Sequence, residues 1–173
     1  PADEATLAAA YAAVEREPEA LLTFAIEPTF PATGYGWVER REEVAPGVFA
    51  VDRFVEKPDL ETATALLADG GFGWNSGMFV FRADTFLSAM RAYFGEGVDQ
   101  LLEIGKGWAE GRGAEVLEAH WETLPKKSVD YAVMEPAAAS DRFPVRTVPL
   151  PVAWHDLGLS LIHISEPTRP LHI

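Results

Sequence analysis

A carboxylate and an ammonium stand side by side at Glu56 and Lys57, directly before Pro58. A carboxylate suits paired sugar hydroxyls, and a lysine ammonium is a compact point charge that suits a phosphate. Lys57 is also the only lysine before Lys106. Pro58 should hold Lys57 extended and end a strand, so both side chains could project into a crevice at a strand end. An ordinary ion pair on the surface is the alternative.

Further strings place polar groups inside apolar runs, as binding pockets usually do. They are Trp74-Asn75-Ser76-Gly77-Met78-Phe79, Ser128-Val129-Asp130-Tyr131-Ala132-Val133-Met134-Glu135 and Trp154-His155-Asp156-Leu157-Gly158. The Asn75 amide both donates and accepts, which matches a sugar hydroxyl, whereas its string could also be a simple turn. Asp130 could contact a sugar or a metal-bound water, or it could only complement a helix dipole. Asp156 is a candidate Mg²⁺ ligand, because magnesium sites use one or two carboxylates.

The composition excludes several classes of protein. The chain has 173 residues, of which 48% are hydrophobic, and it carries a net charge of -13. One domain with a real core is expected, and the apolar runs are too short for a membrane span. A nucleic-acid partner is unexpected, because such proteins need basic patches. The lack of cysteine excludes disulfides and fits a cytoplasmic protein.

Alternating strand and helix patterns predict an α/β fold. The expected strands are 21–26, 36–41, 48–55, 78–81 and 146–150, and the expected helices are 4–16, 60–68, 84–93, 98–106, 114–119 and 129–137. Asp3, Asp59 and Ser128 should begin helices by accepting from free N–H groups of the first turn. Gly70 and Gly71 should end the helix that starts at residue 60.

Together with Thr23-Phe24-Ala25-Ile26-Glu27-Pro28-Thr29 and Thr33-Gly34-Tyr35-Gly36-Trp37-Val38-Glu39, the strings resemble mannose-1-phosphate guanylyltransferases from about Leu21 to Gly158. The resemblance implies a Rossmann-like nucleotidyltransferase fold, with a mixed central sheet flanked by helices. It also implies that GTP and mannose 1-phosphate are joined to give GDP-mannose and pyrophosphate, with Mg²⁺. A sugar phosphate is already a nucleophile, so such catalysis reduces to alignment and charge neutralisation.

The resemblance also implies roles for individual residues that contact the substrate. Gly34 and Gly36 resemble the backbone approach to the sugar. Glu56 and Asn75 resemble ligands of sugar hydroxyls, and Asp130 resembles a further carboxylate of the site.

Lys57 and Asp156 are the candidate catalytic residues, because they resemble the contact to the sugar phosphate and the metal ligand. The family's glycine-rich loop with Arg and Lys, which holds the nucleoside triphosphate, is not found in the sequence. We therefore expect residues 1–158 to be an N-terminally truncated nucleotidyltransferase domain that holds the sugar half of the site and is inactive alone. Residues 159–173 resemble translated sequencing adapter, and we expect them to be a non-native tail.

Two other functions stay open at this point. One is a nucleotidyltransferase for another sugar 1-phosphate, and the other is a non-catalytic regulatory subunit that binds sugar nucleotides on the same fold. The retained Glu56, Lys57, Asn75 and Asp156 argue against the second, because a sensor need not keep a metal ligand. A homo-oligomer and a fused C-terminal isomerase domain also stay open.

Overall fold

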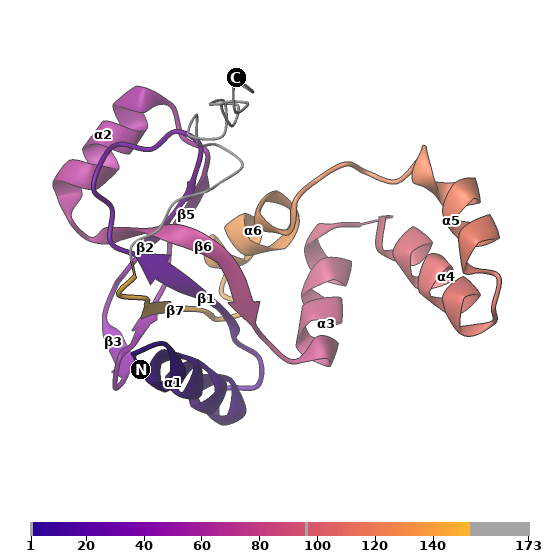
Figure 1. Cartoon of the computed structure of the whole chain (residues 1–173), viewed down its shortest axis with the longest axis horizontal. Helices are drawn as coiled ribbons and strands as arrows, with labels where there is room; N and C mark the ends of the chain where they lie inside the picture. The colour runs from indigo at the N-terminus through magenta and orange to yellow at the C-terminus, as the bar shows by residue number, and fades with distance from the viewer. Residues whose placement is uncertain (1, 96, 153–173) are drawn as a thin grey trace, which may run out of the picture.

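A computed structural model describes residues 2–95 and 97–152 of the chain, and its strands form one mixed sheet (Figure 1). The strands are β1 (Leu21–Ile26), β2 (Gly36–Glu39), β3 (Glu43–Ala45), β4 (Val48–Ala50), β5 (Phe54–Glu56), β6 (Phe72–Val80) and β7 (Val145–Pro149). Their order across the sheet is β3-β4-β7-β1-β6-β2-β5. Strands β1 and β7 are parallel, and the other neighbouring pairs are antiparallel. The predicted mixed α/β fold is confirmed.

Helices cover both faces of this sheet. The helical elements of the described residues are α1 (Ala2–Arg16), α2 (Leu60–Asp69), α3 (Ala83–Tyr93), α4 (Gly97–Ala109), α5 (Gly113–Trp121), the π-helical turn η1 (Asp130–Met134) and α6 (Glu135–Ala138). Buried residues of α1 and α2 pack with Trp37 and Trp74 on one face. Buried residues of α3, η1 and α6 pack with Val38 and Phe54 on the other. Neighbouring residues of a strand point to opposite faces, so β2 contributes to both cores.

Strand β1 and helix α2 form where the sequence predicts them. All six residues of β1 are buried, as expected for an apolar strand between two covered faces. Asp59 caps α2 by accepting from the Thr62 N–H at 2.8 Å, and Gly70 ends the helix with a φ of 75°. Glycine adopts this left-handed conformation without steric cost. Both ends of α2 were therefore predictable from the chemistry of single residues.

Two strand predictions were wrong. The run 48–55 divides into β4 and β5, which lie in different parts of the sheet, and 51–53 connect them. Strand β6 begins at Phe72 instead of residue 78, so the Trp-Asn-Ser-Gly string lies within a strand. It forms a strand because β1 and β2 pair with it from both sides. Strand β3 was not predicted.

The segment after Ser128 is helical, but its first turn is a π-helix instead of an α-helix. The Glu135 N–H donates to the Asp130 carbonyl, five residues back. Pro136 has no N–H and could not continue the α-helical ladder to residue 132. π-Helical turns are rare and occur frequently at functional sites.

Helices α4 and α5 pack on each other and project away from the sheet beyond α3 (Figure 1). Their close approach needs Gly107, because a Cβ there would lie 2.7 Å from Val116 Cγ2. Among the described residues, none of the helices has both the length and the apolar character needed to cross a membrane.

Candidate functional site

Glu56 and Lys57 form the ion pair that their adjacency suggests. Lys57 Nζ lies 3.4 Å from Glu56 Oε1 at the end of β5. The two side chains differ in exposure, because 54% of the Lys57 side chain is exposed and only 6% of the Glu56 side chain. The carboxylate is thus held in the fold, while the ammonium can reach an incoming anion from solvent.

Lys57 is not extended, contrary to the expectation from Pro58. Its φ is 46°, in the left-handed region, and it is the only described residue other than glycine with a positive φ. Such a conformation costs on the order of 1–3 kcal/mol and tends to occur at functional sites. Two hydrogen bonds fix the backbone there: the Lys57 N–H donates to the Tyr35 carbonyl at 3.2 Å, and the Tyr131 hydroxyl donates to the Glu56 carbonyl at 3.3 Å.

Gly36 lies beside the Glu56 carboxylate. The two residues are register partners across β2 and β5. A Cβ at position 36 would lie 2.5 Å from Glu56 Oε2 and 3.2 Å from Asn75 Cβ. The lack of a side chain at Gly36 therefore leaves the space in which the carboxylate lies between β5 and β6.

Asn75 occupies the neighbouring position on β6, where the strand is irregular. The register with β1 shifts between Thr23 and Ala25, and Gly77 adopts a φ of 71°. β-Bulges are frequent next to active sites, where they re-aim side chains. The Asn75 Nδ2 amide donates to Asp130 Oδ1 at 2.9 Å, and its Oδ1 accepts from Thr23 Oγ1 at 2.6 Å.

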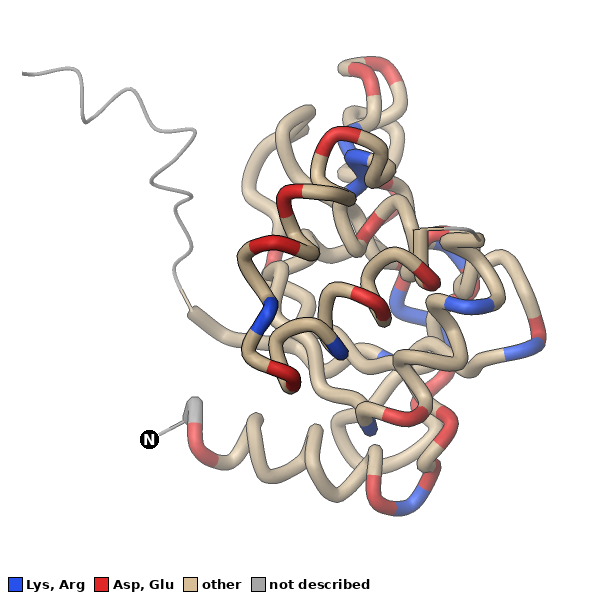
Figure 2. Tube along the Cα trace, turned by 90° about the vertical axis from the view of Figure 1, so that its right-hand side faces the viewer, with Lys and Arg blue, Asp and Glu red and all other residues tan. Residues whose placement is uncertain are grey.

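The two carboxylates of this cluster influence each other. Burial raises the pKa of Glu56 most, and the negative charge of Asp130 raises it further. The Lys57 ammonium acts in the opposite direction, by its charge and its hydrogen bond, and Glu135 adds a smaller upward effect. Acidic residues are spread along much of the trace (Figure 2), so Lys57 is a local cation on an acidic protein.

The structure therefore brings together most of the predicted site residues. Gly36, Glu56, Lys57, Asn75 and Asp130 make one polar cluster on the face covered by η1. Gly34 lies in the loop two residues before β2. Asp156, with the whole Trp154–Gly158 string, lies outside the described residues. The substrate and metal roles of these residues stay predictions.

Two residues that contact this cluster were not predicted as site residues. Thr23 is fully buried in β1 and contacts Asn75, and Tyr131 contacts the Glu56 carbonyl. A single polar residue in the apolar run 21–26 was the available signal for Thr23. The Tyr131 contact spans 75 positions and had no comparable signal.

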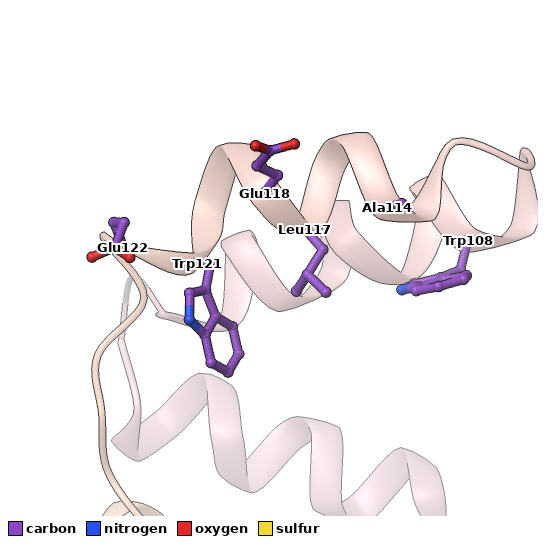
Figure 3. A pocket seen from close by; sticks show the side chains of 6 residues that line it. All are labelled: Trp108, Ala114, Leu117, Glu118, Trp121 and Glu122. Carbon is purple, nitrogen blue, oxygen red and sulfur yellow. The ribbon is translucent and has the colours of Figure 1, made fainter.

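A hollow of about 570 Å³ lies elsewhere, on the α4–α5 pair (Figure 3). It is lined by Trp108, Ala114, Leu117, Glu118, Trp121 and Glu122. Trp108 and Trp121 are 60% and 55% exposed. The lining of this hollow lacks the combination of cation, amide and buried carboxylate found at β5 and β6. We therefore place the candidate site at β5 and β6.

The described part of the chain contains no cluster of three or more histidine, aspartate or glutamate residues that could hold a metal ion. Glu56 and Asp130 alone do not make such a group. The predicted Mg²⁺ site depends on Asp156, outside the described residues.

Comparison with known proteins identifies the family. A profile described as nucleotidyl transferase matches residues 3–161. The chain belongs to the nucleotidyl transferase family. The match extends over the strands and the helical turn that carry Glu56, Asn75 and Asp130.

The chain is similar in sequence to several longer curated proteins. It is 42% identical over 169 residues to the xanthan biosynthesis protein XanB of Xanthomonas campestris pv. campestris, covering 95% of this chain and 35% of the relative. It is 40% identical over 156 residues to the mannose-1-phosphate guanylyltransferase of Escherichia coli, covering 86% of this chain and 31% of the relative. The chain thus spans about a third of the length of the curated relatives it matches.

Solved structures agree on the fold. A crystal structure from Thermus thermophilus, described as mannose-1-phosphate geranyltransferase, superposes with a TM-score of 0.70 at 29% identity, covering 91% of this chain and 42% of that one. A mannose-6-phosphate isomerase from Helicobacter pylori superposes with a TM-score of 0.71 at 24% identity, covering 90% of this chain and 58% of that one. The second likeness shows the fold alone.

Proposed function

We propose that this chain provides the sugar-phosphate site of a mannose-1-phosphate guanylyltransferase. One observation carries the proposal: a half-exposed lysine, a buried carboxylate and an oriented amide meet at the ends of β5 and in β6. That set matches a ligand with one phosphate and several hydroxyls. The 40% identity to the guanylyltransferase of Escherichia coli supports mannose 1-phosphate as that ligand.

The proposed reaction is a nucleophilic substitution at the α-phosphorus of GTP. An oxygen of the sugar phosphate forms the new bond to that phosphorus, the bond to the β-phosphate oxygen breaks, and pyrophosphate leaves. The nucleophile needs no activation by a serine or cysteine. The protein's task is therefore to align two anions and to offset their charge.

Three side chains of the cluster have parts in that task. The Lys57 ammonium binds the sugar phosphate by a charge-assisted hydrogen bond, for which it exchanges its contact with Glu56. The Glu56 carboxylate then accepts from sugar hydroxyls. Asn75 donates its remaining Nδ2 hydrogen to one hydroxyl, beside Asp130. Mg²⁺, which we expect Asp156 to hold, would add charge neutralisation at the phosphates.

Calorimetric titration of the 173-residue chain with sugar phosphates tests this proposal. We expect mannose 1-phosphate to bind more tightly than mannose 6-phosphate. With the phosphate on C1, the ligand can place its phosphate at Lys57 and its hydroxyls at Glu56 together, whereas a phosphate on C6 would turn the hydroxyls away from Glu56. Preference for glucose 1-phosphate would instead indicate a nucleotidyltransferase for another sugar. Equal binding of all three, or of inorganic phosphate alone, would contradict a built sugar site.

A further inference from the structure

The Asn75 amide is held at both ends by groups whose chemistry fixes its orientation. Its Oδ1 accepts from Thr23 Oγ1 at 2.6 Å and from the Gly77 N–H at 3.3 Å. Its Nδ2 donates to Asp130 Oδ1 at 2.9 Å. A carboxylate accepts and a backbone N–H donates, so a flipped amide would face like groups on both sides. The second Nδ2 hydrogen has no hydrogen-bond partner within the described segments.

Thr23 supplies the shorter of the two hydrogen bonds to Asn75 Oδ1. Its side chain is fully buried, so water cannot take its place. The hydroxyl has one hydrogen and two acceptors within reach, Asn75 Oδ1 at 2.6 Å and the Met78 carbonyl at 3.1 Å. The shorter distance favours Asn75. Threonine is also stiff at χ1, which limits the directions in which the hydroxyl can point.

The irregular segment of β6 lies directly beside the contact between Thr23 and Asn75. Thr23 pairs with Phe79, whereas Ala25 pairs with Asn75, so β6 carries extra residues between these pairs. Gly77, with its φ of 71°, lies within that segment. A regular ladder continued from the Ala25–Asn75 pair would place Gly77 beside Thr23 instead of Phe79. Because the Gly77 N–H and the Thr23 hydroxyl both donate to Asn75 Oδ1, the bulge and the threonine act on the same amide.

We propose that Thr23 is a positioning residue, which holds the Asn75 amide so that one Nδ2 hydrogen stays directed at a sugar hydroxyl. Thr23 does not itself contact the ligand. The inference deepens the proposed function and rests on it for the identity of the ligand. The orientation of Asn75 in the free protein can, however, be measured without any ligand.

The sequence makes that measurement unusually direct. Asn75 is the only asparagine among the 173 residues, and Gln100 is the only glutamine. A ¹H–¹⁵N spectrum of the full chain should therefore contain two side-chain NH₂ pairs. Gln100 donates to Thr123 Oγ1 at 3.1 Å on the α4–α5 pair, so its signals serve as an internal reference.

Three substitutions separate positioning from simple packing. Thr23→Val keeps the shape and removes the hydroxyl, and Thr23→Ser keeps the hydroxyl. Thr147→Val is the matched control. Thr147 is the register partner of Thr23 on β7 and equally buried, and its hydroxyl has no hydrogen-bond partner within the described part of the chain.

We expect Thr23→Val to shift the Asn75 NH₂ pair and to weaken mannose 1-phosphate binding about fivefold, the usual effect of one hydrogen bond. Thr23→Ser should restore both readouts, and Thr147→Val should change neither. Unchanged Asn75 signals in Thr23→Val would overturn the inference, as would altered signals with unaltered affinity. Failure of the unsubstituted chain to bind mannose 1-phosphate would instead overturn the proposed function, while the Asn75 signals would still decide the role of Thr23.

Discussion

Gly36 and Glu56 face each other across β2 and β5 so closely that a Cβ on Gly36 would lie 2.5 Å from Glu56 Oε2. The carboxylate lies where a side chain at position 36 would stand. Gly36 therefore pairs with Glu56 in the sheet and, because it has no side chain, leaves room for the Glu56 carboxylate.

Gly36→Ala should destabilise the protein by about 1–3 kcal/mol, because an inserted methyl forces neighbours to move in a packed site. Urea denaturation measures this free energy of unfolding. In a Glu56→Ala background the same substitution should cost less, because the carboxylate is gone. Gly105→Ala is the control: this exposed glycine of α4 has nothing within 4 Å, and alanine should stabilise the helix by about 0.5–1 kcal/mol. Equal costs of Gly36→Ala in both backgrounds would contradict the contact.

Asp130→Asn should lower the pKa of Glu56 toward its ordinary value, because it removes the neighbouring charge that raises it. An NMR titration of the Glu56 carboxyl carbon measures the change. Glu135→Gln is the graded control and should lower the pKa less, and Lys57→Met should raise it. An unchanged Glu56 pKa in Asp130→Asn would mean that the two carboxylates are not coupled.

Glu56 should make the protein less stable as the pH rises. Its pKa in the folded state is raised above the ordinary 4.5, so the folded state binds the proton more tightly than the unfolded state does. The free energy of unfolding should therefore fall from about pH 4.5 upward, through the raised pKa. Glu56→Gln should remove this dependence in denaturation measured at several pH values.

Asp59 provides a comparison of opposite sign, because its pKa is lowered by hydrogen bonds from Thr62. The Asp59 carboxylate therefore stabilises the fold at pH values above its ordinary pKa of 3.8, and this stability is lost as the pH falls through the lowered pKa. Asp59→Asn should remove this pH-dependent stability. If the two variants changed the pH dependence in the same direction, the assigned environments would be contradicted.

Lys57→Ala should weaken mannose 1-phosphate binding by about 1.5–3 kcal/mol, the usual worth of a hydrogen bond to a charged group. Lys106→Ala is the matched control. Lys106 is also an exposed lysine paired with a glutamate, but it lies on α4 and its partner is Glu110, which is not a site residue. Calorimetric titration of both variants compares them. Equal losses would indicate a general charge effect instead of a phosphate contact.

Asp156→Asn should weaken Mg²⁺ binding by the full chain, because the predicted metal ligand would lose its charge. Calorimetry with Mg²⁺ alone measures this without reference to catalysis. Asp141→Asn, which changes an exposed aspartate close in sequence, is the control. Equal Mg²⁺ affinity of Asp156→Asn and the unsubstituted chain would contradict the predicted ligand.

Elements with local signals were predictable from the sequence. Strand β1 is a continuous apolar run, and α2 carries its own cap at Asp59 and its own stop at Gly70. The early start of β6 was not predictable in this way, because Gly73 and Gly77 weaken the strand pattern, and pairing with β1 and β2 decides the outcome.

The same distinction applies to the site. The Glu56–Lys57 pair needed only adjacency in sequence and could be predicted. The contact between Thr23 and Asn75 joins two strands 52 positions apart, beside a shift in their register. The left-handed φ of Lys57 is accompanied by hydrogen bonds from distant segments. Local propensity carries no information about either feature.

Chemical-shift mapping with mannose 1-phosphate shows whether the ligand binds at the end of β5 and in β6. The ¹⁵N-labelled 173-residue chain is titrated with the ligand, and the amide signals that move are located on the structure. We predict shifts at Gly36, Lys57, Asn75 and Asp130, with saturation, and little change at Trp108 and Trp121 on the α4–α5 pair. Shifts confined to the α4–α5 pair, or none at the four site residues, would contradict the assignment.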